Sequence, residues 1–185
     1  MNQEQLNIKQ LIPLGDDDIR RLLGANVKIV EFNLLDNYKN MKELLPKKID
    51  YCIILYGIKA ITDGHWVALF KRDNIISFFD SYGLKPEAPL KKWISKAANE
   101  SMQQDGNLLI NLLNTHKGPI FYNDYSYQDK SNLNIATCGR WAVSFIQYMK
   151  IHKTHTLKTF NKFILALKKN HNGITSDEIV SLLVN

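Results

Sequence analysis

Residues 64–83 read GHWVALFKRDNIISFFDSYG and hold two short apolar runs, at 65–70 and 75–80, separated by a polar turn. Both runs have the length and the aromatic and β-branched content of strands. The Lys-Arg-Asp-Asn segment at 71–74 has the composition of a tight turn. We therefore expect an antiparallel hairpin at the centre of the fold.

The sequence on either side of this hairpin predicts one more strand and several helices. Residues 51–56 form an apolar run that stops at Gly57, as expected for a strand buried on both faces. Residues 120–125 are expected to be a strand or an extended loop, and residues 108–113 fit either a helix or a strand. Helices are expected at 16–23, 35–45, 90–98, 138–151, 157–169 and 176–183.

Two of these helices have clear end signals. Asp16, Asp17 and Asp18 supply an N-cap and an acidic first turn, and Gly24 closes that helix. Thr137 is the expected N-cap of the helix at 138–151. Strands in the middle and helices at both ends predict an α+β fold with a small mixed or antiparallel central sheet flanked by helices.

The length of 185 residues fits a single domain over 1–185. Within it we expect an N-terminal helical region at 1–48, a core at 50–150 and C-terminal helices at 151–185. No apolar run is long enough to span a bilayer, and the polar N-terminus lacks the apolar core of a signal peptide. The two cysteines cannot form a disulfide framework, which favours a reducing compartment.

The formal net charge of +6 permits binding to nucleic acid or other acidic surfaces. The basic residues occur as scattered pairs, such as Lys91-Lys92, without a long block or an aromatic-basic ribbon. A solvated basic surface is the simpler interpretation, and weak DNA binding without sequence preference is the alternative.

Cys138 lies where a polar loop meets a strongly amphipathic helix. The partial positive charge at a helix N-terminus stabilises a thiolate, so Cys138 is a candidate nucleophile. Gly139 follows it and leaves room for a substrate backbone to approach. A buried, inert cysteine is the alternative.

His65 and Asp80 are candidate partners of that thiol. His65 begins a strand after a glycine-containing loop, and fourteen residues separate it from Asp80 at the end of the next strand. A hairpin of this length can return the carboxylate beside the imidazole, which would then act as base and proton donor for the thiol. Alternatively, His65 is a satisfied surface histidine and Asp80 an ordinary turn residue.

The motifs GHW at 64–66, FDSYG at 79–83 and TCGRW at 137–141, in that order, resemble those of the adenovirus-type and SUMO-protease-type cysteine peptidases (clan CE). The resemblance covers roughly residues 50–150 and is closest to proteases of virophages and of Polinton (Maverick) transposons. It implies the adenain-type or ubiquitin-like-protease-type fold. It also implies a catalytic triad of His65, Asp80 and Cys138.

The same resemblance implies an oxyanion-binding glutamine upstream of the cysteine. Gln128 is the only glutamine between Gln104 and Cys138, although the interval from Gln128 to Cys138 is longer than is usual in the family. Asn132 and Asn134 are the fallback candidates, and an exposed loop amide is the alternative for Gln128. The expected substrate-binding residues are Gly64, Trp66, which also shields the catalytic pair from water, and Gly139.

The resemblance to the viral branch implies a cysteine endopeptidase that cuts viral capsid or core precursors during virion maturation. We expect no cofactor or metal, a monomer without membrane contact, and a location in the host cytoplasm (the virus factory) and the virion interior. Removal of ubiquitin-like modifiers from host proteins is the alternative activity, and an inactive binding module is a further one. A zinc site at His152 and His155 is disfavoured because no further ligand accompanies them at motif spacing, and Cys52 is expected to be structural.

Overall fold

The computed structural model describes residues 2–60, 63–132, 134–153, 156–171 and 173–184. Its centre is a five-stranded sheet in the order β1-β2-β3-β4-β5. The strands are β1 (Lys28–Glu31), β2 (Tyr51–Ala60), β3 (Asp63–Arg72), β4 (Ile75–Asp80) and β5 (Ile120–Tyr122). The three central strands are antiparallel, whereas β1 and β5 run parallel to their neighbours. The predicted α+β fold with a mixed central sheet is confirmed.

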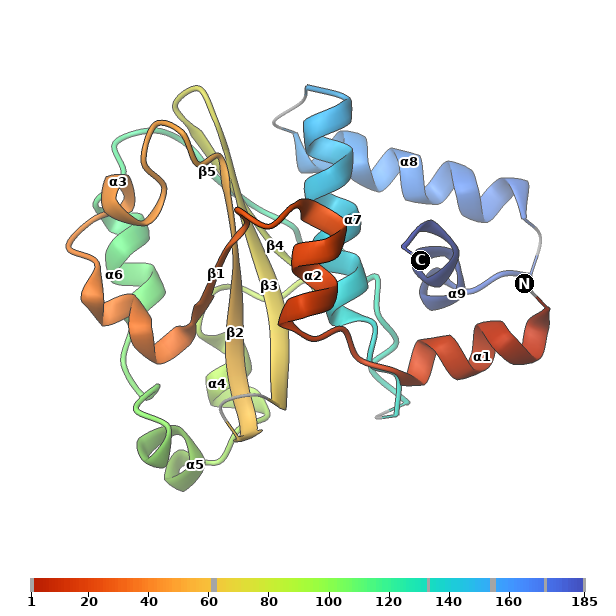
Figure 1. The fold of residues 1–185 in the computed structure, drawn as a ribbon, viewed down its shortest axis with the longest axis horizontal. Helices are drawn as coiled ribbons and strands as arrows, with labels where there is room; N and C mark the ends of the chain where they lie inside the picture. The colour runs from red at the N-terminus through yellow and green to blue at the C-terminus, as the bar shows by residue number, and fades with distance from the viewer. Residues whose placement is uncertain (1, 61–62, 133, 154–155, 172, 185) are drawn as a thin grey trace.

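Helices cover both faces of this sheet (Figure 1). One side carries η1 (Phe32–Asn37), α3 (Met41–Leu44), α4 (Ala88–Lys92), α5 (Lys96–Ser101) and α6 (Leu108–Asn114). The other side carries α2 (Asp16–Leu23) and α7 (Cys138–Ile151), with α1 (Gln3–Leu11), α8 (Leu157–Asn170) and α9 (Ser176–Leu183) in a further layer. Among the helices of the described ranges, none is long and apolar enough to cross a membrane.

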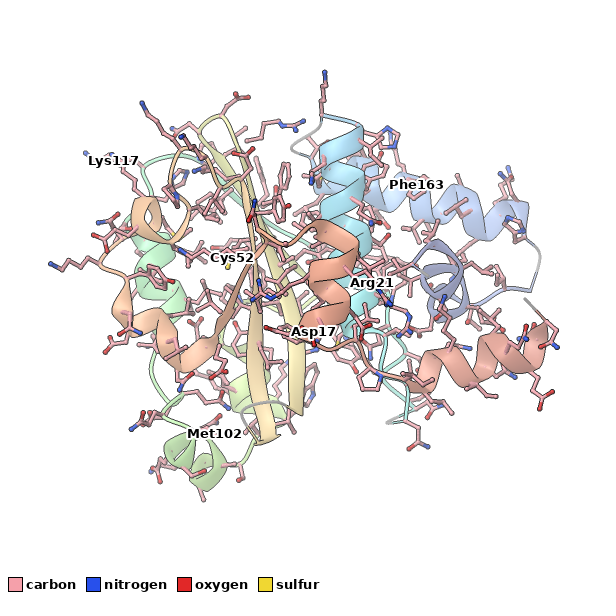
Figure 2. All side chains as sticks on the ribbon, in the orientation of Figure 1. Asp17, Arg21, Cys52, Met102, Lys117 and Phe163 are labelled. Carbon is pink, nitrogen blue, oxygen red and sulfur yellow. The ribbon has the colours of Figure 1, made fainter. Side chains whose placement is uncertain are left out.

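The two faces of the sheet belong to two separate apolar cores. Because successive side chains of a strand point to opposite faces, Ala68 and Phe70 of β3 enter the core under α7, while Val67 and Leu69 enter the core under α6. Cys52 also belongs to the second core, and Figure 2 shows its sulfur on that side of the sheet. Burial on both faces explains why these strands are nearly continuous apolar runs.

The central hairpin confirms the prediction made from residues 64–83. Val67 lies opposite Asp80 and Arg72 lies opposite Ile75, so β3 is longer than the predicted run and reaches the turn. Asp73 takes a left-handed backbone conformation with φ of 54°, which aspartate tolerates better than most residues. The hairpin register fixes which residues of the two strands share a face.

Two expectations for residues 1–48 are wrong. Instead of one helix at 35–45 there are two short ones, η1 and α3, because the Asn40 side chain accepts hydrogen bonds from the backbone N–H groups of Lys42 and Glu43 and starts a new helix. The region also contains β1, whose Lys-Ile-Val-Glu sequence is too short to identify without its parallel partner β2.

The other boundaries differ less from the predictions. The helix expected at 90–98 is divided into α4 and α5, because Ser95 accepts a hydrogen bond from the N–H of Ala98 and caps a second helix. The N-cap of α2 is Gly15 rather than an aspartate, although its first turn is acidic as predicted. The ambiguous segment 108–113 is helical, and α7, α8 and α9 match their predicted ranges within one residue.

An aromatic cluster joins the hairpin to α7 and α8. The Phe79 ring stacks on Phe145 with ring centroids 4.6 Å apart, and Phe160 meets it edge-on at 5.6 Å. All three side chains are at most 1% exposed. This contact holds α7 against β4, one residue before Asp80.

Substitution of Phe79 by alanine should lower the free energy of unfolding by about 3–5 kcal/mol, because it leaves a cavity in this cluster. Phe121→Ala is the matched control, since Phe121 is 46% exposed on β5 and its loss should change stability by at most about 0.5 kcal/mol. Urea denaturation of both variants measures the difference. Equal stability losses would contradict the central role of the cluster.

Candidate active site

Cys138 is the first residue of α7 and is 7% exposed. Its backbone N–H has no acceptor within the helix, because the first N–H groups of an α-helix have no carbonyl one turn earlier. Thr137 holds the N-cap position, as predicted, but its hydroxyl does not cap the helix. It donates to Asp177 instead. The helix N-terminus therefore keeps free backbone donors beside the Cys138 sulfur.

His65 and Asp80 lie on the same face of the hairpin. Asp80 is paired with Val67, so His65 is displaced from it by two residues along β3. The His65 Nε2 and Asp80 Oδ2 atoms are 3.2 Å apart, within ion-pair distance although not aligned as a hydrogen bond. Such pairs often tighten only when substrate binds. Neither side chain is more than 3% exposed.

The Cys138 side chain lies close enough to His65 to raise the pKa of the imidazole. Since Nε2 faces Asp80, Nδ1 is the ring nitrogen left for the thiol. The three residues proposed from the sequence as a triad are therefore adjacent, in the order carboxylate, imidazole and thiol. A nucleophile, its base and a group that orients the base require this arrangement.

Electrostatics favour a charged His65. Burial lowers the pKa of its imidazole, but the neighbouring Asp80 and Cys138 side chains outweigh burial and raise the pKa to about 10. At neutral pH the ring is therefore an imidazolium. A positive charge in contact with the sulfur stabilises a thiolate.

Asn123, the residue directly after β5, fixes Asp80. Its Oδ1 accepts from the Asp80 N–H at 2.8 Å, and its Nδ2 donates to the Asp80 carbonyl at 2.6 Å. The Tyr82 N–H donates to Asp80 Oδ1 at 2.7 Å, which leaves Oδ2 for His65. Sequence reasoning missed Asn123, because an asparagine in a turn-rich segment gives no local sign of a partner 43 residues away.

Two aromatic residues that the sequence did not single out border His65. Tyr82 stacks on the imidazole with ring centroids 5.1 Å apart, and Trp93 meets it edge-on at 5.7 Å. Tyr82 and Trp93 also contact each other at 4.6 Å. Trp93 is 42% exposed, so this pair connects the buried imidazole to the protein surface.

Gln128 is a buried side chain, not an exposed loop amide. Its Oε1 accepts from the Ser81 hydroxyl at 2.9 Å, and its Nε2 donates to the Ile135 carbonyl at 2.9 Å. An amide nitrogen carries two protons, so one N–H remains for an oxyanion. Asn132 and Asn134 are exposed, which makes them weaker candidates than Gln128.

The predicted substrate-binding residues are tightly packed. A Cβ at Gly64 would lie 1.9 Å from the Tyr56 carbonyl oxygen. Only glycine fits there, because the backbone of β2 lies too close for any side chain. A Cβ at Gly139 would lie 3.0 Å from Leu14 Cβ and 3.1 Å from Trp66 Cδ1. Trp66 is 6% exposed and donates its indole N–H to the Leu14 carbonyl at 2.9 Å. These contacts explain all three residues by packing, and their contact with substrate stays a prediction.

The remaining cysteine and the histidine pair lie away from this site. Cys52 is fully buried in β2, and burial raises the pKa of its thiol to about 12, with Lys28 opposing the shift. His152 ends α7 and packs on Tyr148, whereas His155 lies outside the described residues. The part of the chain that the structure describes contains no cluster of three or more metal-binding side chains.

The fold and the site thus define an α+β protein with an adjacent cysteine, histidine and aspartate at one end of its sheet. No protein-family model matches the chain. The sequence is 30% identical to the uncharacterized protein V9 of the Sputnik virophage over 183 residues, covering 97% of this chain and 98% of that protein. The chain belongs to the family of this virophage protein.

Among solved structures, the chain is similar to two crystal structures of the ASFV pS273R protease. The selenomethionine form gives a TM-score of 0.48 with 14% sequence identity over 94% of this chain and 68% of that chain. The second structure gives a TM-score of 0.45 at the same identity, over 94% and 67% of the two chains. These scores lie below the level at which a common fold can be inferred.

The substitution Asp80→Asn should lower the pKa of His65, because burial is then opposed by Cys138 alone. In the wild type the imidazolium should persist beyond pH 9. Nitrogen-15 NMR of the histidine side chains measures both states, with Asp73→Asn in the hairpin turn as control.

The same pair makes stability depend on pH. Because the folded pKa of about 10 exceeds the ordinary value of 6.5, the stabilisation is complete below about pH 6.5 and is lost as the pH rises through 10. A wild-type His65 that titrates near pH 6.5 would contradict the ion pair.

Proposed function

We propose that this protein is a cysteine endopeptidase with His65, Asp80 and Cys138 as its catalytic triad. The observation that carries the proposal is the chain of contacts from Asp80 through a charged His65 to Cys138 at a helix N-terminus. Burying the His65 and Asp80 charges costs desolvation energy. A catalytic role for His65 accounts for this cost, whereas an inactive binding module gives no reason for it.

The proposed reaction proceeds in two steps. The Cys138 thiolate attacks the peptide carbonyl carbon, and a C–S bond forms while the carbonyl oxygen becomes an oxyanion. The oxyanion accepts hydrogen bonds from Gln128 Nε2 and the Cys138 backbone N–H. His65 then protonates the leaving amine as the C–N bond breaks.

Water completes the cycle. His65 takes a proton from water, the hydroxide attacks the thioester, and the C–S bond breaks to release the acid and restore the thiolate. Asp80 keeps the imidazole in one orientation throughout. The aromatic residues Tyr82 and Trp93 limit solvent access to the imidazole.

We propose viral capsid or core precursors as substrates, cut during virion maturation in the host cytoplasm and virion interior by a monomeric enzyme. Membership of a virophage family supports a viral role. The small exposure of Cys138 supports cleavage next to glycine or another small residue, because a bulky side chain could not approach the sulfur. As part of this proposal, the protein is encoded by a Mavirus-type virophage or a Polinton transposon.

Incubation with virion structural precursors should give discrete cleavage products, whereas SUMO and ubiquitin fusions should remain intact. Cys138→Ala should abolish cleavage, and Cys52→Ala should retain it, because Cys52 lies in the other core. Mass spectrometry of the products identifies the cleaved bonds. Cleavage of the modifier fusions alone would replace the proposed substrate class with ubiquitin-like conjugates.

Weak DNA binding is proposed for the surface around α8. Between Asp129 and Asp177 the sequence contains eight lysines and arginines and no acidic residue. The positive charge is therefore concentrated in this segment. Lys158, Lys162 and Lys169 are exposed and spaced to lie on one face of α8. Such a face fits the phosphate backbone without reading its sequence.

The dissociation constant for a random DNA duplex should rise about 10²-fold between 50 and 200 mM salt, as expected for three or four phosphate contacts. The double variant Lys158→Glu/Lys162→Glu should weaken binding strongly, and the control Lys47→Glu/Lys48→Glu should do so much less. Fluorescence anisotropy provides the measurement. Equal effects of the two variants would show that general charge, not α8, attracts DNA.

A further inference from the structure

Asp177 is a buried carboxylate that the triad does not use. It lies in the first turn of α9, the last helix, and is 2% exposed. Its Oδ1 accepts from the Thr137 hydroxyl and from the Trp141 indole N–H at 3.2 Å. Its Oδ2 accepts from the Asp129 backbone N–H at 2.8 Å. A buried acid with both oxygens satisfied in this way is a fixed point of the structure.

Two of the three donors adjoin the proposed oxyanion donors. Thr137 directly precedes Cys138, whose backbone N–H is one donor. Asp129 directly follows Gln128, whose side-chain amide is the other. The Asp177 carboxylate therefore binds both segments that carry an oxyanion donor. These two donors must lie at a set separation to bind one oxyanion.

The hydrogen bond from Thr137 to Asp177 replaces one that Thr137 could make within its own helix. The Thr137 hydroxyl would ordinarily cap α7 by accepting from a backbone N–H of the first turn, but here it donates to Asp177. The N–H groups at the start of α7 are thereby left without this side-chain acceptor, which is favourable where an oxyanion must bind. Trp141, one turn along α7, fixes the same helix to the same carboxylate.

The carboxylate is presented by a well-anchored element. Thr175 and Glu178 form a reciprocal capping box at the start of α9. Gln3 of α1 donates to Glu178, so the first helix braces the last one, and Figure 1 shows the two helices near each other on the far side of α7. Burial raises the pKa of the Asp177 carboxyl, while its three donors oppose that shift.

We propose that Asp177 is a positioning residue that fixes the distance between the two oxyanion donors, Gln128 Nε2 and the Cys138 backbone N–H. This inference rests on the proposed peptidase function. It assigns to the C-terminal helix a role in transition-state binding rather than in activating the thiol, which the His65 and Asp80 pair performs.

The two roles can be separated with two reagents. Alkylation of Cys138 by iodoacetamide needs the thiolate but forms no oxyanion. A peptide aldehyde forms a C–S bond with Cys138 and places its former carbonyl oxygen, as a hemithioacetal, in the oxyanion site. Asp177→Asn keeps the side-chain shape but cannot accept from Thr137 and Asp129 at once without turning its NH₂ group toward one of these donors.

For Asp177→Asn we expect kcat to fall about 10–10²-fold and aldehyde affinity to fall in proportion, as for partial loss of an oxyanion donor. KM and the alkylation rate should stay within about 2-fold of wild type. Gln128→Ala should give the same pattern, and the control Glu4→Gln, at an exposed carboxylate of α1, should match wild type in all four measurements.

Two results would overturn the inference alone. One is an Asp177→Asn variant with wild-type kcat and aldehyde affinity. The other is a variant whose alkylation rate and melting temperature fall together with kcat, which would make Asp177 only an anchor of the fold. If Asp177→Asn does not fold, Thr137→Val tests the same contact and should lower kcat without slowing alkylation.

Failure of the proposed function gives a different result. A wild-type protein whose Cys138 is alkylated, but which binds no aldehyde and cleaves no precursor, would overturn the peptidase assignment and this inference with it. If the wild-type protein binds the aldehyde, the peptidase assignment stands, and the Asp177 variants then test the positioning role of Asp177.

Discussion

The site depends on the register between β3 and β4. With Val67 opposite Asp80, His65 and Asp80 share a face at the end of the sheet. A shift of one residue would turn one of the two side chains to the other face, because side chains alternate along a strand. The shift would also expose alternate members of both apolar cores. The packing that stabilises the fold therefore also fixes the ion pair.

The second constraint is the buried helix α7. Most of its residues are enclosed, and Trp141, Phe145 and Met149 are fully buried between the sheet and the outer helices. A helix held so firmly cannot rotate or slide without opening cavities in the core. Its first residue, Cys138, is thus placed against His65 by packing far from the sulfur.

The chain termini complete the site from the outside. The segment that leads into α2 passes over the start of α7: the Gln10 carbonyl accepts from the Ala136 N–H, and the Leu14 carbonyl accepts from Trp66. From the other end of the chain, α9 supplies Asp177. These polar contacts are buried or partly buried, and they specify one arrangement of the loops around Cys138.

The sequence alone predicts the central hairpin, the helix that begins at Cys138 and the triad candidates at the ends of these elements. These features depend on local periodicity and turn composition, which a single sequence displays. Four further features of the site are visible only in the folded protein: the burial of Gln128, the support of Asp80 by Asn123, the aromatic contacts of His65 and the position of Asp177. Each of these features depends on contacts between residues that are distant in the chain. Folding brings such side chains together, and the residues next to each of them in the sequence do not indicate the partner.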